Sequence, residues 1–161
     1  LNQILKEGHQ SLIFSQFTSY LDYLESYIKK NGWLYSRIDG SQNIKRRQVE
    51  VDNFQEGKSR IFLISLKAGG FGLNLTAASY IFLMDPWWNP AIENQAIDRA
   101  HRIGQKNTLT IYRPIIEKSI EEKVLELQAT KRELFHDLLP DDGEQYFSNR
   151  VSLEDLENLI D

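Results

Sequence analysis

The stretch QAIDRAHRIGQ, which begins at Gln95, carries residue types suited to binding phosphate. Arg99 lies four residues after Gln95, and Arg102 follows three residues later. On an α-helix, at about 100° per residue, these three side chains share a stripe about 60° wide. Guanidinium groups bind phosphate oxygens in a planar, bidentate geometry. The ordinary alternative is a set of surface arginines that form ion pairs with Glu93 or Asp98, and the spacing alone leaves both interpretations open.

A glycine-rich segment, KAGGFGLNLT from Lys67 to Thr76, is a second place where phosphate could bind. Glycines allow tight turns, so that backbone N–H groups can approach an anion. The segment could equally be a tight turn between a strand and a helix. It is not a P-loop of the GxxxxGK[ST] type, and the GKS sequence at Gly57 does not qualify because Asp52 stands five residues before it. If the arginines of QAIDRAHRIGQ bind phosphate, they could therefore serve a nucleotide that another domain holds.

The composition excludes several classes of protein. Hydrophobic residues make up 41% and charged residues 26% of the 161-residue chain, as is typical of a soluble globular protein. The chain has no cysteine, which excludes disulfides and thiolate metal sites. Its three histidines lie far apart and show no ligand spacing, so no metal site is expected. The longest apolar runs are far too short to cross a membrane.

Charge is distributed unevenly along the chain, whose net charge is −4. Residues 1–116 carry 14 Lys and Arg against 10 Asp and Glu, whereas residues 117–161 carry 5 against 13. The body is therefore mildly basic and the tail strongly acidic, and a basic face on the body could meet nucleic-acid phosphate. Within the tail, SLEDLENLI has apolar residues at helical spacing and predicts a short amphipathic helix. The sequence begins without methionine, so we expect a piece of a longer protein.

The hydrophobic pattern predicts strands and helices that alternate along the chain. Apolar runs predict strands at Ser11–Ser15, Leu34–Ile38, Arg60–Ser65, Tyr80–Met84 and Leu109–Tyr112. Apolar residues at helical spacing predict helices at Phe17–Asn31, Asn43–Gln55, Pro90 to about Arg102, and from Ser119 to Leu139. This alternation is typical of an α/β fold, in which helices cover both faces of a parallel sheet.

Local signals refine three of these helices. The pair Asn31-Gly32 is expected to end the first helix, because glycine accepts the left-handed conformation found at helix ends. The second helix is expected to bury Ile44, Val51 and Phe54. The last helix is expected to begin with a capping box from Ser119 to Glu122.

Four polar or glycine-rich loops are expected to meet at one edge of the sheet. They follow the first four predicted strands and comprise residues 15–18, 39–41, 67–76 and 85–90. In open α/β sheets, binding sites gather beyond the carboxyl ends of the strands. The sequence therefore predicts that the site lies at this edge.

Five stretches of the sequence together resemble one family, the Swi/Snf-type ATPases, which are DNA translocases of helicase superfamily two. SLIFSQF and RIDGS are similar to the first motifs of the second, C-terminal lobe of these proteins, although Gln42 stands where the family more often has Thr. SLKAGGFGLNLTAA resembles the glycine-rich fifth motif, and DPWWNPAIENQAIDRAHRIGQ resembles the sixth motif and its lead-in. SIEEKVLELQATKREL is similar to the helix that follows the lobe and braces it. The resemblance covers residues 10–139.

The resemblance implies a three-layer α/β fold and a function. Residues 1–116 would form a RecA-like lobe whose parallel sheet is sandwiched by helices, residues 117–140 the bracing helix, and residues 141–161 the acidic tail with its short helix. The whole protein would be an ATP-dependent translocase or remodeller of double-stranded DNA. This lobe would supply arginine fingers and part of the track for the DNA backbone. The missing first lobe would hold most of ATP and Mg²⁺, so the isolated chain should not hydrolyse ATP.

The same resemblance implies roles for individual residues. Arg99 and Arg102 resemble the arginine-finger pair, which stabilises charge on the transferred γ-phosphoryl group. The residues that would contact the nucleotide or shape its side of the cleft are Gln95, Gly70, Gly72 and Asn74. The residues that would contact the DNA backbone are Ser15, Gln16, Lys67 and Thr76. Such backbone contacts position a protein on the duplex without reading its sequence.

Other residues of these motifs have structural interpretations that stay open. Asp39 could simply cap the turn at Gly40, and Arg47 could hold that loop by an ion pair. Trp87 and Trp88 could pack between parts of the protein or stack on DNA.

Two other functions and the location also stay open. The same lobe would suit a strand-separating helicase of superfamily two, and the acidic tail could make the chain a non-catalytic interaction module. The spelling SLKAGG and the lack of a long insertion resemble prokaryotic members, for which we expect a cytoplasmic, nucleoid-associated protein. A eukaryotic member would be nuclear, and no membrane partner is expected.

Overall fold

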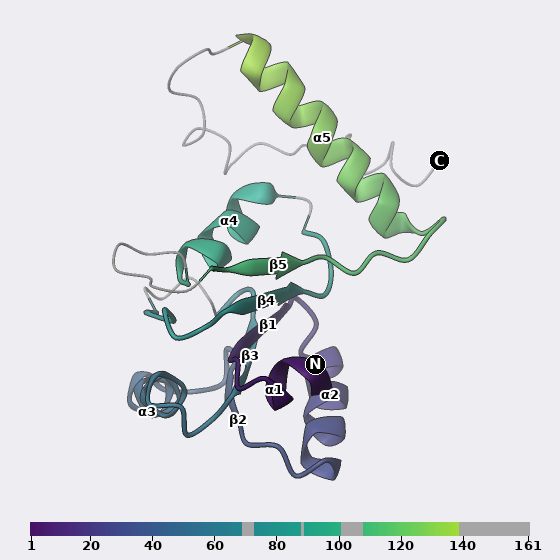
Figure 1. Ribbon diagram of the computed structural model, residues 1–161. Helices are drawn as coiled ribbons and strands as arrows, with labels where there is room; N and C mark the ends of the chain where they lie inside the picture. The colour runs from purple at the N-terminus through teal and green to yellow at the C-terminus, as the bar shows by residue number, and fades with distance from the viewer. Residues whose placement is uncertain (69–72, 88, 101–107, 139–161) are drawn as a thin grey trace.

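One sheet of five parallel strands organises the chain, of which the computed structural model describes residues 1–68, 73–87, 89–100 and 108–138. The strands are β1 Ser11–Ser15, β2 Tyr35–Ile38, β3 Ile61–Ser65, β4 Tyr80–Leu83 and β5 Thr110–Tyr112, in the spatial order β2-β3-β1-β4-β5. The helices are α1 Asn2–Lys6, α2 Thr18–Lys30, α3 Ile44–Gln55, α4 Pro90–Asp98 and α5 Ile120–Leu138. Figure 1 shows α1 and α2 on one side of the sheet and α3 and α4 on the other. The predicted three-layer α/β fold is confirmed.

The central strands β1 and β3 are buried along their whole length. They pair in register from Ser11 with Ile61 to Ser15 with Ser65, and β4 pairs with the other side of β1. Helices cover both faces of this part of the sheet, which explains why SLIFS and IFLIS carry apolar side chains on both faces. Because all these strands are parallel, their carboxyl ends lie at one edge, as predicted.

Two apolar cores lie on opposite faces of the sheet, because successive strand residues point to opposite faces. The core beneath α3 and α4 includes Leu12, Phe14, Phe62, Ile64, Val51, Phe54, Ala96 and Ala100. The core beneath α1 and α2 includes Ile13, Ile61, Leu63, Leu21 and Ile28. Complete burial of a large apolar side chain stabilises a fold by about 1.5–3 kcal/mol. These two cores therefore hold the layers together.

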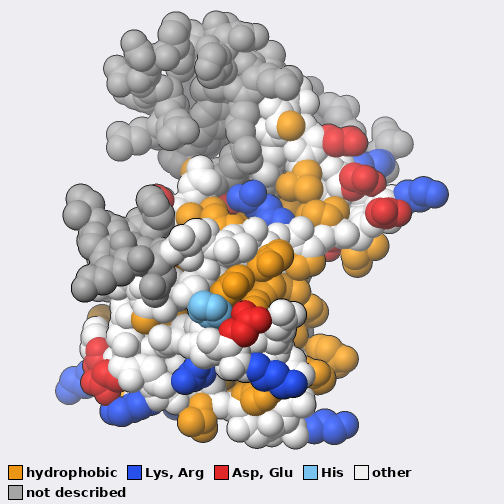
Figure 2. Space-filling model, viewed as in Figure 1, with side chains coloured by type: hydrophobic (Ala, Val, Ile, Leu, Met, Phe, Trp, Pro, Cys, Tyr) orange, Lys and Arg blue, Asp and Glu red, His pale blue; other side chains and the backbone are white. Residues whose placement is uncertain are grey.

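Aromatic side chains remain exposed on the side of the molecule that carries α2. Phe17, Tyr23 and Tyr27 are 56%, 71% and 52% exposed, whereas Leu21 and Ile28 of the same helix are buried. Figure 2 shows hydrophobic side chains on this side of the molecule in orange. The apolar pattern predicts this helix, but the apolar residues cover a wider part of the helix surface than the face that the helix buries.

The end of α2 follows its predicted stop signal. Gly32 has φ +68, and its N–H donates to the Lys29 carbonyl at 3.0 Å. The Trp33 N–H reaches the Ile28 carbonyl at 3.2 Å. This pair of hydrogen bonds is a Schellman motif, in which glycine takes the left-handed conformation.

The prediction is wrong for one of the three residues of α3 that we expect to be buried. Val51 and Phe54 are buried as expected, but Ile44 is 82% exposed. Arg47 lies on the same face nearer the sheet and is only 9% exposed, and its Nη2 donates to the Asp39 carbonyl at 3.3 Å. The inward position at the start of this helix is therefore polar, and Ile44, the first helical residue, extends beyond it into solvent.

Several boundaries also differ from the predicted ones. Four of the strands and three of the helices begin or end one residue inside the predicted range, and α1 was not predicted. The helix α4 ends at Asp98 rather than near Arg102, and Arg99 is its C-cap. At this end the Ala100 N–H bonds the carbonyl three residues back, Ile97, so the last turn is tighter than an α-helix.

The long helix α5 begins with the predicted capping residues. The Ser119 hydroxyl accepts the Glu121 N–H at 3.2 Å, and the Glu122 carboxylate accepts the Lys118 N–H at 2.9 Å. The Glu122 carboxylate therefore binds the N–H of Lys118, one residue before the cap Ser119, and not the N–H of Ser119 itself. The predicted end at Leu139 and the predicted helix of the tail lie outside the described residues. None of the helices described is both long enough and apolar enough to cross a membrane.

The end of α2 generates a stability prediction. Replacing Gly32 with Ala should lower the free energy of unfolding by about 1–2 kcal/mol, because an L-residue is strained at positive φ. No atom would contact the added methyl group, so the loss measures the backbone alone. Gly40→Ala is the matched control, since its site is equally open and its φ is not positive. Equal losses of unfolding free energy for both variants, measured by urea unfolding, would contradict this account.

Candidate functional site

A buried carboxylate joins the loops that follow β1 and β4 at the carboxyl edge of the sheet. Asp85 is 7% exposed, and it accepts the Ser15 hydroxyl at 2.5 Å and the Gln16 N–H at 2.8 Å. The Ser15 oxygen in turn accepts the Phe17 N–H at 3.0 Å. Charge-assisted hydrogen bonds of this kind are the strong ones. The two loops are therefore held in one geometry by side chains of the protein.

These contacts bear on two residues that we predict to contact DNA. The Ser15 side chain is fully buried and bonded to Asp85, so a direct phosphate contact would require this hydrogen bond to break. Gln16 is half-buried, and its backbone is fixed while its side chain is not. DNA contact by either residue stays a prediction. The sequence places Asp85 in the loop after the fourth strand, but does not predict that its carboxylate binds the Ser15 loop.

A side chain at the end of α3 holds the segment that follows the glycine-rich loop. Gln55 donates to the Asn74 carbonyl at 2.7 Å and accepts the Ala77 N–H at 3.0 Å. Thr76 lies between these contacts and is half-buried, whereas Asn74 is exposed. Lys67, at the start of the loop, is also exposed. The structure thus brings Asn74 and Thr76 together and leaves the Asn74 side chain accessible.

Arg99 is fixed through its backbone rather than through its side chain. Its carbonyl accepts the Leu75 N–H at 3.0 Å, which joins the end of α4 to the segment held by Gln55. Its Nε is buried without a hydrogen-bond partner, and no ion pair of Arg99 occurs among the described residues. The alternative of a pair with Glu93 is not observed, because Glu93 lies beside Arg113 instead, at 3.3 Å from its Nε. The guanidinium group therefore retains hydrogen-bonding capacity.

The start of α4 explains how the sequence positions Arg99. Asn89 caps the helix by accepting the Ala91 N–H at 3.0 Å, and Pro90 follows as the first helical residue. Ala96 and Ala100 face the core. Gln95 is exposed, one helical turn before Arg99. The predicted neighbourhood of Gln95 and Arg99 is thus present.

Several residues of the predicted motifs lie outside the described residues: Arg102, Gly70, Gly72 and Trp88. The other tryptophan of that pair, Trp87, is half-buried and packs against the core beneath α3 and α4, which supports the packing interpretation for it. In the part of the chain that is described, no group of three or more His, Cys, Asp or Glu residues could hold a metal ion.

The loop after β2 is held by charged side chains. Asp39 accepts both the backbone N–H and the hydroxyl of Ser41, at 3.0 and 2.5 Å, which confirms that it caps this turn. The hydroxyl of Ser41 is the main reason that the pKa of Asp39 lies below its ordinary value. Arg37 pairs with the Asp39 carboxylate at 3.1 Å, while Arg47 holds the loop through the Asp39 carbonyl.

Arg37 also reaches an acidic residue of α2. Glu25 accepts hydrogen bonds from Lys29, Tyr35 and Arg37, the first two at 2.6 Å. Burial alone would raise the pKa of Glu25, but these three donors outweigh it and lower the pKa to about 2. The network fastens α2 to β2.

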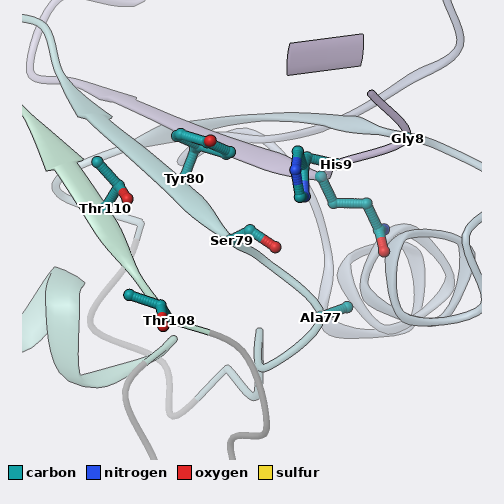
Figure 3. A pocket seen from close by; sticks show the side chains of 8 residues that line it. Gly8, His9, Ala77, Ser79, Tyr80, Thr108 and Thr110 are labelled. Atoms are coloured by element: carbon teal, nitrogen blue, oxygen red, sulfur yellow. The ribbon is translucent and has the colours of Figure 1, made fainter. Parts of the chain in front are cut away.

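A pocket of about 440 Å³ lies at the opposite edge of the sheet. Figure 3 shows its lining, which comes from segments that lead into β1, β4 and β5: Gly8, His9, Gln10, Ala77, Ser79, Tyr80, Thr108 and Thr110. The rings of His9 and Tyr80 lie edge to face, with their centroids 5.3 Å apart. None of the predicted site residues lines this pocket, but Ala77 does, so the segment that Gln55 holds lies near this edge rather than at the predicted carboxyl edge.

Comparisons with known proteins identify the relatives of this chain. A family described as "Helicase conserved C-terminal domain" matches residues 1–104. "DNA repair protein RAD5B" of Arabidopsis thaliana is 49% identical over 136 residues, which are 84% of this chain and 11% of that protein. "ATP-dependent helicase rhp16" of Schizosaccharomyces pombe is 44% identical over 152 residues, which are 94% of this chain and 17% of that protein. This chain therefore spans only a small part of these two relatives.

A solved structure shares the fold. The C-terminal part of the Fun30 ATPase domain is 35% identical to this chain and superposes with a TM-score of 0.74. The match covers 95% of this chain and 44% of that one. The sheet and its flanking helices are therefore those of a RecA-like lobe.

The Asp85 contacts generate a second stability prediction. Asp85→Asn should lower the free energy of unfolding by about 2 kcal/mol, because a charged acceptor of two hydrogen bonds is lost from a buried site. The loss should shrink in a Ser15→Ala background, where one of those bonds is already absent. Asp52→Asn, at an exposed position of α3, should change stability by less than about 0.5 kcal/mol. Identical losses with and without the Ser15 hydroxyl, measured by urea unfolding, would contradict the pairing.

The lowered pKa of Glu25 predicts a pH dependence. Its carboxylate stabilises the fold at pH values above its ordinary pKa of 4.5, and this contribution is lost as the pH falls towards 2. Glu25→Gln should therefore cost about 1 kcal/mol at pH 7, as for a partly exposed ion pair. The difference from the unmodified protein should vanish by about pH 2. Glu50→Gln is the control, and a Glu25→Gln loss that stays constant from pH 7 to pH 3 would disprove the linkage.

Proposed function

Because this chain belongs to the helicase C-terminal domain family, as a lobe of the Swi/Snf type, we propose that it is the second lobe of an ATP-driven translocase on double-stranded DNA. ATP would bind between this lobe and a preceding one. This lobe would supply Arg99 and Arg102 to the nucleotide and part of the surface that follows the DNA backbone. The ATPase activity belongs to the whole protein, of which this chain is one part.

The guanidinium of Arg99, which forms no ion pair with the residues that the structure describes, carries this proposal. Its Nε is buried without a partner, and its backbone is tied to Leu75 beside the glycine-rich loop. A preorganised cation of this kind can stabilise charge that develops on the γ-phosphoryl group during transfer. Gln95 lies one turn away on the same face and would contact the nucleotide. Arg102 would complete the pair, as the resemblance of QAIDRAHRIGQ to the sixth motif implies.

The remaining parts of the ATP site are assigned to the preceding lobe. This chain has no P-loop sequence, and the described residues offer no cluster of acids for Mg²⁺. Closure of the two lobes would bring Arg99 to the phosphates, and opening after hydrolysis would move one lobe past the other. On this account the isolated chain should not hydrolyse ATP. Gly70, Gly72 and Asn74 would shape the loop that couples the nucleotide cleft to DNA.

The DNA track would follow segments that side chains of the lobe hold in place. Lys67 is exposed in the loop after β3, and Gln16 and Thr76 are half-buried in segments that other side chains fix. These residues would bind phosphate groups and position the lobe without reading sequence. Ser15 would serve mainly by holding the Gln16 loop through Asp85, and would contact DNA only if its hydroxyl left that carboxylate.

Strand separation is the second candidate activity. One relative is named an ATP-dependent helicase, and a separate pin or wedge elsewhere in the protein would decide between translocation and unwinding. An unwinding assay and a translocation assay on the protein that carries both lobes would distinguish the two. The named relatives come from eukaryotes, and a eukaryotic protein with this function would be nuclear, whereas a prokaryotic one would be associated with the nucleoid.

Removal of the Arg99 guanidinium tests the proposal. In the protein that carries both lobes, Arg99→Ala should lower the kcat of DNA-stimulated ATP hydrolysis by about 10³-fold or more, the range typical of arginine fingers. Arg99→Lys should restore little activity, because an ammonium group lacks the planar fork. Arg46→Ala, which removes an exposed arginine of α3, is the control and should leave kcat unchanged.

Two results would contradict the proposal. One is an Arg99→Ala protein whose kcat stays within about twofold of the unmodified value, since a finger contributes far more. The other is ATP hydrolysis by residues 1–161 alone that Arg99→Ala abolishes, because the site would then be complete within this chain.

A further inference from the structure

A buried carboxylate on α4 lies where three segments meet. Glu93 is 1% exposed, and its Oε1 accepts the Trp87 N–H at 2.7 Å. The Oε2 atom lies 3.3 Å from Nε of Arg113, in the segment that leaves β5. Gln128 of α5 approaches Oε1 to 3.4 Å and also donates to the Trp87 carbonyl. A charge buried this deeply is stable only with such partners, so the three segments are held to one another through Glu93.

Gln128 is the point at which α5 docks onto the lobe. Among the α5 side chains that are described, residues 120–130, it is the only one that is buried, at 2% exposed. Figure 1 shows α5 beyond α4, away from the other helices. An amide that bonds both a buried carboxylate and a backbone carbonyl fixes direction as well as contact, which an apolar side chain would not do. The orientation of α5 relative to α4 therefore depends on this amide.

The helix α4 has a small fully buried apolar face. Its fully buried apolar side chains are those of Ala96 and, just beyond its end, Ala100, while Ile92 and Ile97 pack against the same core and stay partly exposed. Alanine buries much less apolar area than Leu or Phe, and so contributes less to packing. The polar contacts of Glu93 near one end and the Leu75–Arg99 hydrogen bond at the other add directional constraints to this apolar contact and help to set how the helix lies.

We infer that Gln128, through Glu93, is a positioning residue for Arg99 and that α5 thereby sets the rate of ATP hydrolysis. This inference rests on the proposed role of Arg99 as an arginine finger. Glu93 and Arg99 are six residues apart, or about 9 Å along the helix axis. A tilt of about 6° at Glu93 would displace Arg99 by about 1 Å, and a displacement of that size can cost about 10²-fold in rate.

The test is a double-mutant cycle in the protein that carries both lobes, with single-turnover ATP hydrolysis at saturating DNA. Gln128→Leu, which keeps the approximate volume but removes the amide, should lower the rate by about tenfold and leave the KM for ATP within about twofold. In an Arg99→Ala background the same change should lower the residual rate by less than about twofold, because no finger remains to be displaced. Gln128→Glu, which places a second carboxylate beside Glu93, should show the same dependence on Arg99. Glu126→Gln, at an exposed position of α5, is the control.

Hydrogen exchange in the same variants separates positioning from general stability. Gln128→Leu should speed amide exchange in residues 87–98 by about tenfold and leave residues 61–65 of β3 unchanged. Faster exchange in both segments would mean a general loss of stability and would overturn the inference. So would an equal rate loss with and without Arg99, or unchanged exchange in residues 87–98.

The outcomes also distinguish this inference from the function on which it rests. If Arg99→Ala lowers the rate but Gln128→Leu does not, the finger stands and the positioning role of Gln128 is wrong. If Arg99→Ala leaves the rate unchanged, both the finger and its positioning are wrong.

Discussion

The parallel pairing of β1 with β3 and β4 is the constraint on which the rest of the structure depends. It brings the carboxyl ends of these strands to one edge, where the chain must turn into loops whose backbone groups no strand can pair. Side chains from distant segments satisfy those groups instead. Asp85 binds the amide of Gln16 at this edge, while Gln55, at the end of α3 near the amino ends of the strands, binds the segment from Asn74 to Ala77. The geometry of this edge is therefore built into the protein.

Arg99 lies beside the segment that Gln55 binds, and its backbone is fixed while its guanidinium group is not paired among the described residues. Glu93, an acid on the same helix, is already occupied by the Trp87 amide and lies beside Arg113. Donors fixed in place without an internal partner are available to charge that develops in a ligand. Under the proposed function, the polar contacts fix the frame and leave one cation for the phosphates of ATP.

Local patterns predict much of this fold, because strand alternation, helix stops and helix caps each depend on residues close in sequence. They fail where a long-range contact decides, as at Ile44, whose expected place against the sheet is taken by the buried Arg47. The role of Asp85 could not be predicted, since its partner Ser15 lies 70 residues away. A signal for the contact between Glu93 and Gln128 does exist in the sequence, namely an acid close to the apolar face of a short helix, although its partner, 35 residues on, is not marked.

The central claim is that Arg99 completes an ATP site whose other half lies on a preceding lobe. A structure of the protein that carries both lobes, bound to DNA and to a transition-state analogue of ATP, tests it most directly. We predict that the Arg99 guanidinium donates a hydrogen bond to the group in the γ-phosphate position, while its carbonyl keeps the bond from Leu75. An Arg99 side chain that instead pairs with Asp98 or faces solvent in that complex would contradict the account.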